Sequence, residues 1–151
     1  MHADFGDYYR WHYPRLVGFL LVLGASVPEA TEVAQQAMNE LFRHWDQVTN
    51  RRAWTCGSAM RLVQQRDRRA GLESARVPAT DASAWPAEHE IIGRISGLPP
   101  RQRQIIAWKL MEFAAGEIAA ELHLSPEAVR ADLAEARKAL RPYLMAARSG
   151  R

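Results

Sequence analysis

Gly116-Glu-Ile-Ala-Ala-Glu-Leu-His-Leu-Ser-Pro-Glu-Ala-Val-Arg130 is the stretch that decides the fold, and it continues as Ala-Asp-Leu-Ala-Glu-Ala-Arg-Lys-Ala-Leu140. Its apolar residues recur at the spacing of two short helices that meet across a turn. The residues expected in their shared core are Ile118, Leu122, Leu124, Val129 and Leu133. The small side chains of Ala119 and Ala120 let the two helices cross closely. The pattern predicts a helix-turn-helix, and a helical hairpin used only for packing is the alternative that it leaves open.

The start of the second helix carries a strong local signal. Ser125 supplies a hydroxyl cap, Pro126 suits the first turn, and Glu127 faces the positive end of the helix dipole. His123 stands in the turn, where a positive φ is expected, and histidine tolerates that conformation better than most residues. We therefore expect a helix from residue 126 to at least Leu140, whose N-terminal half can enter a major groove of DNA.

Helical patterning fills most of the remaining chain, without the alternation typical of strands. The predicted helices are residues 4–12, 14–24, 28–44, 51–69, 88–96, 100–112, 114–122 and 126–140, with Pro142 fraying or kinking the last one. Residues 71–87 are rich in Pro, Ser and Thr and lack a sustained apolar period, which is typical of a linker. The sequence thus predicts an all-α fold of two small helical domains, residues 1–70 and 88–148, joined by a flexible linker of residues 71–87.

Composition and charge favour a globular protein with a polyanionic partner. The chain has 151 residues, of which 48% are hydrophobic and 25% charged, and its net charge is +3. Between residues 51 and 70, six arginines stand against a single acid. Cys56 is the only cysteine, so no internal disulfide is expected and the cytoplasm is the default compartment. The apolar run of residues 16–23 is too short for a membrane span or anchor.

The sequence carries no motif typical of an enzyme. It has no phosphate-binding glycine loop, no nucleophile elbow and no HExxH motif. The five histidines are scattered without the spacing of metal ligands. We expect a protein that is not an enzyme, with no catalytic residue, no cofactor and no metal.

Several short motifs in order along the chain resemble one known family. Leu98-Pro-Pro-Arg-Gln-Arg-Gln-Ile-Ile106 precedes the helix-turn-helix at the distance usual in region 4 of sigma-70 factors. Four upstream motifs resemble region 2 of the same family: Tyr9-Arg-Trp-His-Tyr-Pro-Arg-Leu-Val17, Glu32-Val-Ala-Gln-Gln36, Leu41-Phe-Arg-His-Trp45 and Arg52-Ala-Trp54. The chain is therefore similar to bacterial sigma-70 RNA polymerase sigma factors, in particular the extracytoplasmic function (ECF) group.

The resemblance implies two partners, core RNA polymerase and promoter DNA. In the family, region 2 docks on the polymerase clamp helices and opens the -10 element, while region 4 holds the -35 element. Carried over by position, the polymerase-facing residues are Glu32, Gln35, Gln36 and Asn39. An ordinary solvated helix face is the alternative for these four. An anti-sigma protein is a further partner that the resemblance allows.

The candidate DNA-binding residues fall into two groups. Arginines of the basic helix are expected to contact single-stranded backbone: Arg51, Arg52, Arg61, Arg66, Arg68 and Arg69. The second helix of the helix-turn-helix adds Ser125, Glu127, Arg130, Arg137 and Lys138. A solvated charged face is the alternative for the arginines of the first group. We expect Trp54 to pack in the core rather than to stack on a base.

The sequence also departs from the family pattern. Gln36 stands where an acid is usual, and Arg61 and Gln65 replace an asparagine and an acid. Asp132 and Glu135 stand where basic or neutral residues are common, and we expect them to flank the groove-facing strip and lower DNA affinity. These substitutions support an alternative function: a sigma-like DNA-binding regulator or protein-interaction module that has lost promoter opening.

Overall fold

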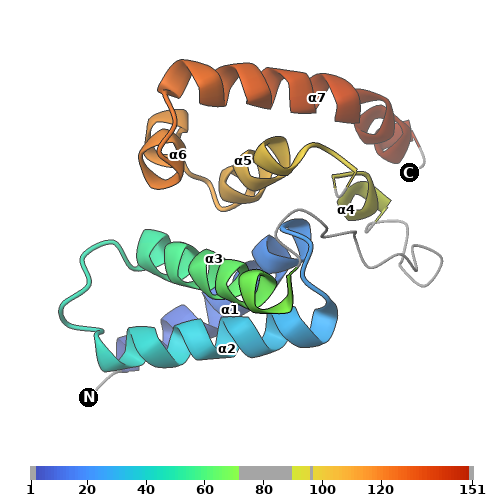
Figure 1. The fold of residues 1–151 in the computed structure, drawn as a ribbon. Coiled ribbons are helices and arrows are strands. Elements are labelled where there is room, and N and C mark those ends of the chain that lie inside the picture. The colour runs from blue at the N-terminus through green and yellow to red at the C-terminus, as the bar shows by residue number, and fades with distance from the viewer. Residues whose placement is uncertain (1–2, 72–89, 96, 150–151) are drawn as a thin grey trace. The chain divides into compact units, whose positions relative to one another are not determined.

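The computed structural model describes residues 3–71, 90–95 and 97–149, and in these residues it contains helices and no strand (Figure 1). The all-α prediction is confirmed. By their contacts, residues Met1–Leu21 and Ala25–Arg76 form one compact unit, and Val22–Gly24 and Val77–Arg151 form a second. The predicted linker, residues 71–87, lies outside the described residues except for Gly71.

The first unit contains the helices α1 (Ala3–Val22, without its last residue), α2 (Val27–Arg43) and α3 (Arg51–Ala70). The helix α2 packs along α3. Its buried side chains recur every three or four residues, so one stripe of the helix faces the core: Ala30, Val33, Ala34, Ala37, Met38 and Leu41. The aromatic rings of α1 meet Trp45 just after α2, where the Phe5 and Tyr8 ring centroids lie 5.5 and 5.6 Å from it.

The predicted break between two helices at Pro14 is wrong, because α1 runs unbroken through this residue. Pro14 has no N–H to donate to the Arg10 carbonyl, and its ring crowds that carbonyl. Packing on both sides of Pro14 holds the helix together nonetheless. Phe5 contacts Phe42 at a centroid distance of 5.0 Å before it, and Phe19 is buried after it. Pro14 is itself exposed, so water can reach the Arg10 carbonyl.

The ends of α2 and α3 follow from local caps. The Glu29 backbone N–H donates to Ser26 Oγ at 3.3 Å, which confirms the predicted start of α2. The Ala53 N–H donates in the same way to Asn50 Oδ1 at 3.1 Å at the start of α3. Gly71 ends α3 with a φ of 70°, a left-handed conformation that glycine adopts without a Cβ clash.

The second unit contains α4 (Glu90–Ile95), α5 (Pro100–Leu110), α6 (Ala115–Leu122) and α7 (Pro126–Ser149). The last helix packs against the other three. Trp108 and Phe113 lie with ring centroids 5.1 Å apart and are both fully buried. The helix α7 continues through Pro142 to Ser149, so the helix does not end at this proline.

The predicted core of the helix-turn-helix is confirmed in part. Ile118, Val129 and Leu133 are buried, whereas Leu122 and Leu124 are half-buried. Ala119 is buried where α6 meets α7, but Ala120 is exposed and takes no part in the crossing. Since α6 has only eight residues, its last turn lies at the edge of the core.

Candidate nucleic-acid interface

The four residues expected to face polymerase share one side of α2. Glu32, Gln35, Gln36 and Asn39 are all exposed, opposite the buried stripe of the helix. Glu40, one residue further, is half-buried and accepts a hydrogen bond from Ser58 Oγ of α3 at 3.4 Å. The first unit therefore presents an exposed polar surface on α2 within residues 32–39. Of its four polar side chains, Glu32 also contacts α3.

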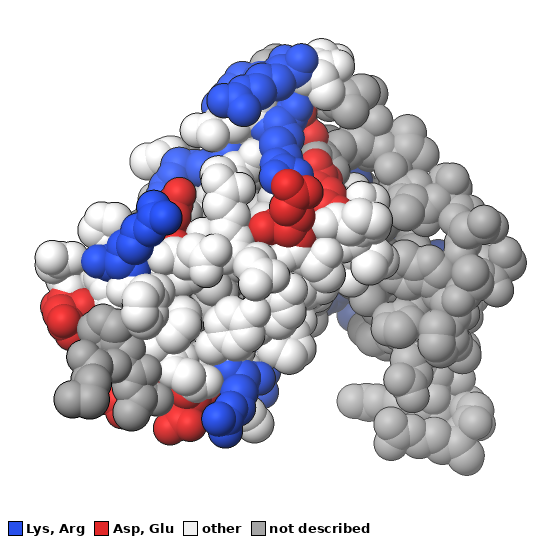
Figure 2. Space-filling view, turned by 90° about the horizontal axis from the view of Figure 1, so that it is seen from below, with Lys and Arg blue, Asp and Glu red and all other residues white. Residues whose placement is uncertain are grey.

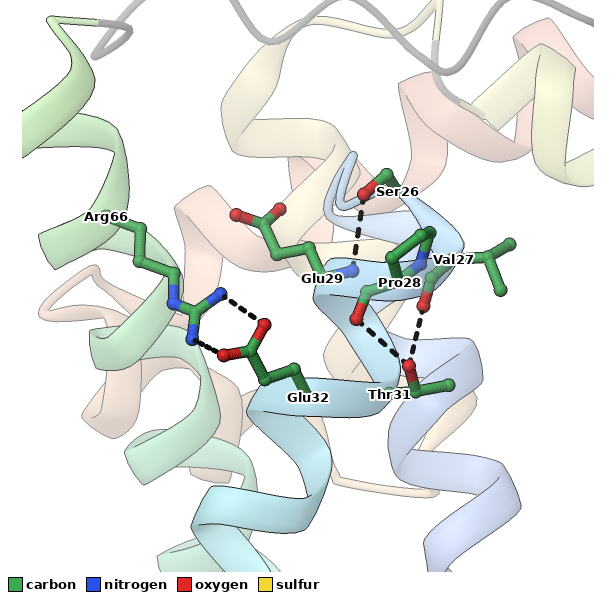
Figure 3. Close-up of polar contacts among 7 residues, drawn as sticks. All are labelled: Ser26, Val27, Pro28, Glu29, Thr31, Glu32 and Arg66. Carbon is green, nitrogen blue, oxygen red and sulfur yellow. Dashed lines mark hydrogen bonds and ion pairs between the residues drawn. The ribbon is translucent and has the colours of Figure 1, made fainter.

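Glu32 forms an ion pair with Arg66 of α3, and Figure 3 draws both of its contacts. Arg66 Nη2 lies 3.1 Å from Glu32 Oε1, and Nη1 donates to Oε2 at 3.4 Å. Both carboxylate oxygens thus meet both terminal nitrogens of the guanidinium, the paired geometry that arginine favours with carboxylates. One residue predicted to bind polymerase and one predicted to bind DNA are joined to each other.

The arginines of α3 differ in what they can contact. Arg61, Arg68 and Arg69 are exposed. Arg51 lies over the Trp45 ring at 3.6 Å from its centroid, and its Nη2 donates to the Trp45 carbonyl at 3.1 Å. The guanidinium of Arg51 therefore stabilises the turn between α2 and α3, a role that the sequence did not indicate.

Trp54 was expected to pack in the core, and this prediction is wrong. Its side chain is half-buried, and its ring is tilted against His44 with a centroid distance of 6.1 Å. Its position near the start of α3 leaves one part of the indole at the surface. Exposed aromatic rings can stack on the bases of single-stranded nucleic acids.

The surface of the protein is not uniformly basic. Figure 2 shows one face on which basic and acidic side chains stand around a broad uncharged area. An aromatic ring is also exposed on α1, where Trp11 is 62% exposed. The Arg15 guanidinium lies over this ring, 4.7 Å from its centroid. Positive charge in the first unit is instead concentrated in α3, whose only acid is Asp67.

The turn of the helix-turn-helix has the predicted conformation. His123 adopts a φ of 57° and a ψ of 44°, and the Leu124 N–H donates to the Ala119 carbonyl at 2.9 Å. Ser125 Oγ then accepts from the Ala128 N–H at 3.1 Å and caps α7, as expected. The left-handed turn and the cap together fix the direction in which α7 leaves the turn.

The candidate DNA-binding side chains of α7 are all exposed: Ser125, Glu127, Arg130, Arg137 and Lys138. Arg130 Nη1 lies 4.0 Å from Glu127 Oε1, a weak surface pair. At about 100° per residue, Arg130, Arg137 and Arg141 fall within about 40° of one another. This group of three exposed arginines is called the arginine flank below, and it lies to one side of the buried stripe that contains Leu133.

The sequence led us to expect an unpaired Asp132 beside the groove-facing strip, but this residue has a partner in the structure. Its side chain is only 14% exposed, and its carboxylate accepts a hydrogen bond from Arg101 Nε of α5. Glu135 is exposed. The contact places the Asp132 charge toward α5, so the repulsion of phosphate predicted for this residue is reduced.

The N-terminal part of the helix-turn-helix is nevertheless acidic. Residues 112–135 contain one arginine, Arg130, and six acids: Glu112, Glu117, Glu121, Glu127, Asp132 and Glu135. The next segment, residues 136–148, contains four basic residues and no acidic residue. The charge of α7 therefore changes sign along its length, and phosphate is attracted mainly by its C-terminal half.

The described residues contain no group of three or more histidine, cysteine or acidic side chains that could hold a metal ion. Among the same residues, none of the helices is both long and apolar enough to cross a membrane.

Residues 88–140 match the family model described as Sigma-70, region 4. No curated protein and no solved structure matches the chain. The matched segment spans α4 to α6 and α7 as far as Leu140, so it contains the helix-turn-helix and its turn at His123. The helix-turn-helix of the second unit is thus similar to sigma-70 region 4.

Proposed function

We propose that this chain, with its sigma-70 region 4 domain at residues 88–140, is a sigma factor of the ECF type. It directs core RNA polymerase to specific promoters and starts transcription there. The region 4 match over a helix-turn-helix with a capped second helix is the observation that carries the proposal. In this proposal α7 holds the -35 element, and residues 1–70 act as region 2.

Two features of the first unit support its assignment as region 2. The exposed polar face of α2 offers hydrogen-bonding groups to a protein partner: Glu32, Gln35, Gln36 and Asn39. The basic helix α3 offers exposed arginines and the half-buried Trp54 to a single DNA strand. Polymerase and DNA would therefore be bound by neighbouring helices of one unit.

Transcription in vitro tests the proposal directly. The full chain is added to core polymerase with genomic DNA fragments, and transcript ends are mapped. We expect a small set of defined start sites that core polymerase alone does not produce. If a folded chain binds core polymerase but yields no transcripts, promoter opening is absent and the proposed function is wrong.

The acidic segment 112–135 favours a second candidate, a sigma-like regulator or protein-interaction module. An acidic helix-turn-helix is repelled by phosphate and is better suited to a basic protein surface. As a protein-interaction module, the full chain binds core polymerase or another protein and fails to bind duplex DNA at moderate salt. As a DNA-binding regulator, it binds the duplex but starts no transcripts. Titration of a labelled duplex at several salt concentrations, together with the transcription assay, separates these outcomes from the proposed function.

A further inference from the structure

The ion pair between Glu32 and Arg66 joins two surfaces that the proposed function assigns to different partners. Glu32 belongs to the polar face of α2, and Arg66 belongs to the basic helix α3 (Figure 3). The two residues are separated by 34 positions in the sequence. They meet only because α2 and α3 pack side by side.

Both members of the pair remain accessible from solvent. The side chain of Glu32 is 68% exposed and that of Arg66 is 32% exposed. An exposed pair of this kind is held weakly, because water and salt compete for both charges. A partner can therefore take one member away from the other without unfolding the unit.

We infer that this pair couples polymerase binding to DNA binding: a partner that takes Glu32 releases Arg66 for phosphate, and DNA that takes Arg66 releases Glu32. The inference rests on the proposed function, since it requires that α2 meets a protein and α3 meets DNA. In the free chain each charge neutralises the other, which lowers the affinity for both partners. Each partner then strengthens the binding of the other by the same factor, as thermodynamic linkage requires.

The size of the coupling follows from the exposure of the pair. Exposed ion pairs stabilise by amounts that correspond to about a 1.4- to 5-fold change in an equilibrium constant. We expect the coupling factor to lie in this range at low ionic strength and to shrink as salt is added. The pair is thus a modest bias toward joint binding and not an on–off switch.

Substitution of Glu32 tests the inference, because it should move the two affinities in opposite directions. The full-length variant Glu32→Gln loses the carboxylate that is proposed to bind core polymerase, and it leaves Arg66 without its ion pair to Glu32. We expect weaker co-purification with core polymerase and about 1.4- to 5-fold tighter binding of a labelled single-stranded oligodeoxynucleotide at low salt. A purely structural role of the pair would weaken both. Glu32→Lys is less suitable, since it places a second cation beside Arg66.

The matched control is Asp46→Asn, which removes one negative charge at an exposed position of the same unit. It reports the general effect of net charge on oligonucleotide binding. The gain from Glu32→Gln should exceed that of Asp46→Asn, and the excess should vanish in an Arg66→Gln background. Equal gains from the two variants, or an unchanged excess without Arg66, would overturn the inference.

A failure of the proposed function gives a different result. If neither the parent chain nor any variant binds the oligonucleotide while circular dichroism shows intact helices, α3 is not a DNA-binding surface. The assignment of the first unit and the coupling are then both wrong. If the parent chain binds both partners and the variants behave like Asp46→Asn, only the coupling is wrong.

Discussion

Arg101, in the first turn of α5, donates from Nε to the carboxylate of Asp132 in the second turn of α7. The carboxylate side is largely buried and the arginine side is 55% exposed. The two helices also pack against each other, so the contact spans the interface that orients α7. An acid of α7 therefore has a structural partner within its own unit.

We expect Asp132→Asn to lower the free energy of unfolding by about 1 kcal/mol. A hydrogen bond between charged groups contributes more than this, and the exposure of Arg101 reduces it. Urea denaturation followed by circular dichroism measures the change. Glu135→Gln is the matched control, since Glu135 is exposed on the same helix. Equal stability of the two variants would show that the contact does not stabilise the unit.

Contacts of this kind mark the limit of what the sequence could predict. Caps and turns depend on neighbouring residues, and the predictions for Ser26, His123 and Ser125 were confirmed. The pairing of Arg101 with Asp132 depends on residues 31 positions apart, which no local pattern reveals. The same reason explains why the pairing of Glu32 with Arg66 could not be foreseen.

The continuity of α1 was missed for a related reason. A proline in mid-chain is a reliable local signal against a helix, and only tertiary packing overrides it. On either side of Pro14, Phe5 contacts Phe42 and Phe19 is buried. Trp54 shows the opposite error: we expected this large aromatic residue in the core, yet it lies near the start of α3 and is only half-buried.

The left-handed turn at His123 leads to a prediction about stability. His123 holds a φ of 57°, at which its Cβ crowds the backbone, and glycine avoids this crowding. We expect His123→Gly to raise the free energy of unfolding by about 0.5–1 kcal/mol. Ala120→Gly, at an exposed position inside α6, should lower it by about 1 kcal/mol. Thermal unfolding of both variants shows whether the two free energies of unfolding change in these opposite directions. A destabilised His123→Gly protein would contradict the backbone strain inferred at His123.

The environment of His12 predicts a pH dependence. His12 stacks on Tyr8 with ring centroids 4.1 Å apart, and its Nδ1 lies 3.2 Å from the Tyr8 carbonyl. Burial lowers the pKa of His12, and Arg15 and Arg52 lower it further, although the Tyr8 hydrogen bond opposes them. The unfolded chain therefore binds this proton more readily than the folded one, and stability falls as the pH drops through about 6.5.

Substitution of His12 separates this effect from the rest of the chain. We expect the free energy of unfolding of His12→Gln to vary less between pH 7.5 and 5.5 than that of the parent chain. His44→Gln is the control, because His44 is exposed and its Nδ1 lies 3.0 Å from the Glu40 carbonyl in a similar local contact. A parent-like pH dependence in His12→Gln would show that another group controls the transition.

The arginine flank of α7 leads to the last prediction. Arg130, Arg137 and Arg141 cover roughly 16 Å along the helix at a rise of 1.5 Å per residue. Acids crowd the N-terminal part of the helix-turn-helix, so phosphate should approach from the C-terminal half. We expect Arg137→Gln and Arg141→Gln each to weaken duplex DNA binding roughly two- to fivefold at low salt, whatever the sequence of the duplex. Each should also reduce the salt slope by about one unit.

Lys138 was expected from the sequence to bind DNA, but it lies outside the arginine flank, so Lys138→Gln is the matched control. It removes the same charge from an exposed position of the same helix, about 100° away from Arg137. Phosphate that follows the flank contacts Arg137 and Arg141 directly and meets Lys138 only through long-range attraction, which salt screens. Lys138→Gln should therefore leave the salt slope nearly unchanged. If it lowers the slope as much as Arg137→Gln does, DNA lies over the outer face of α7 rather than along the flank, and the contacts have to be reassigned to that face.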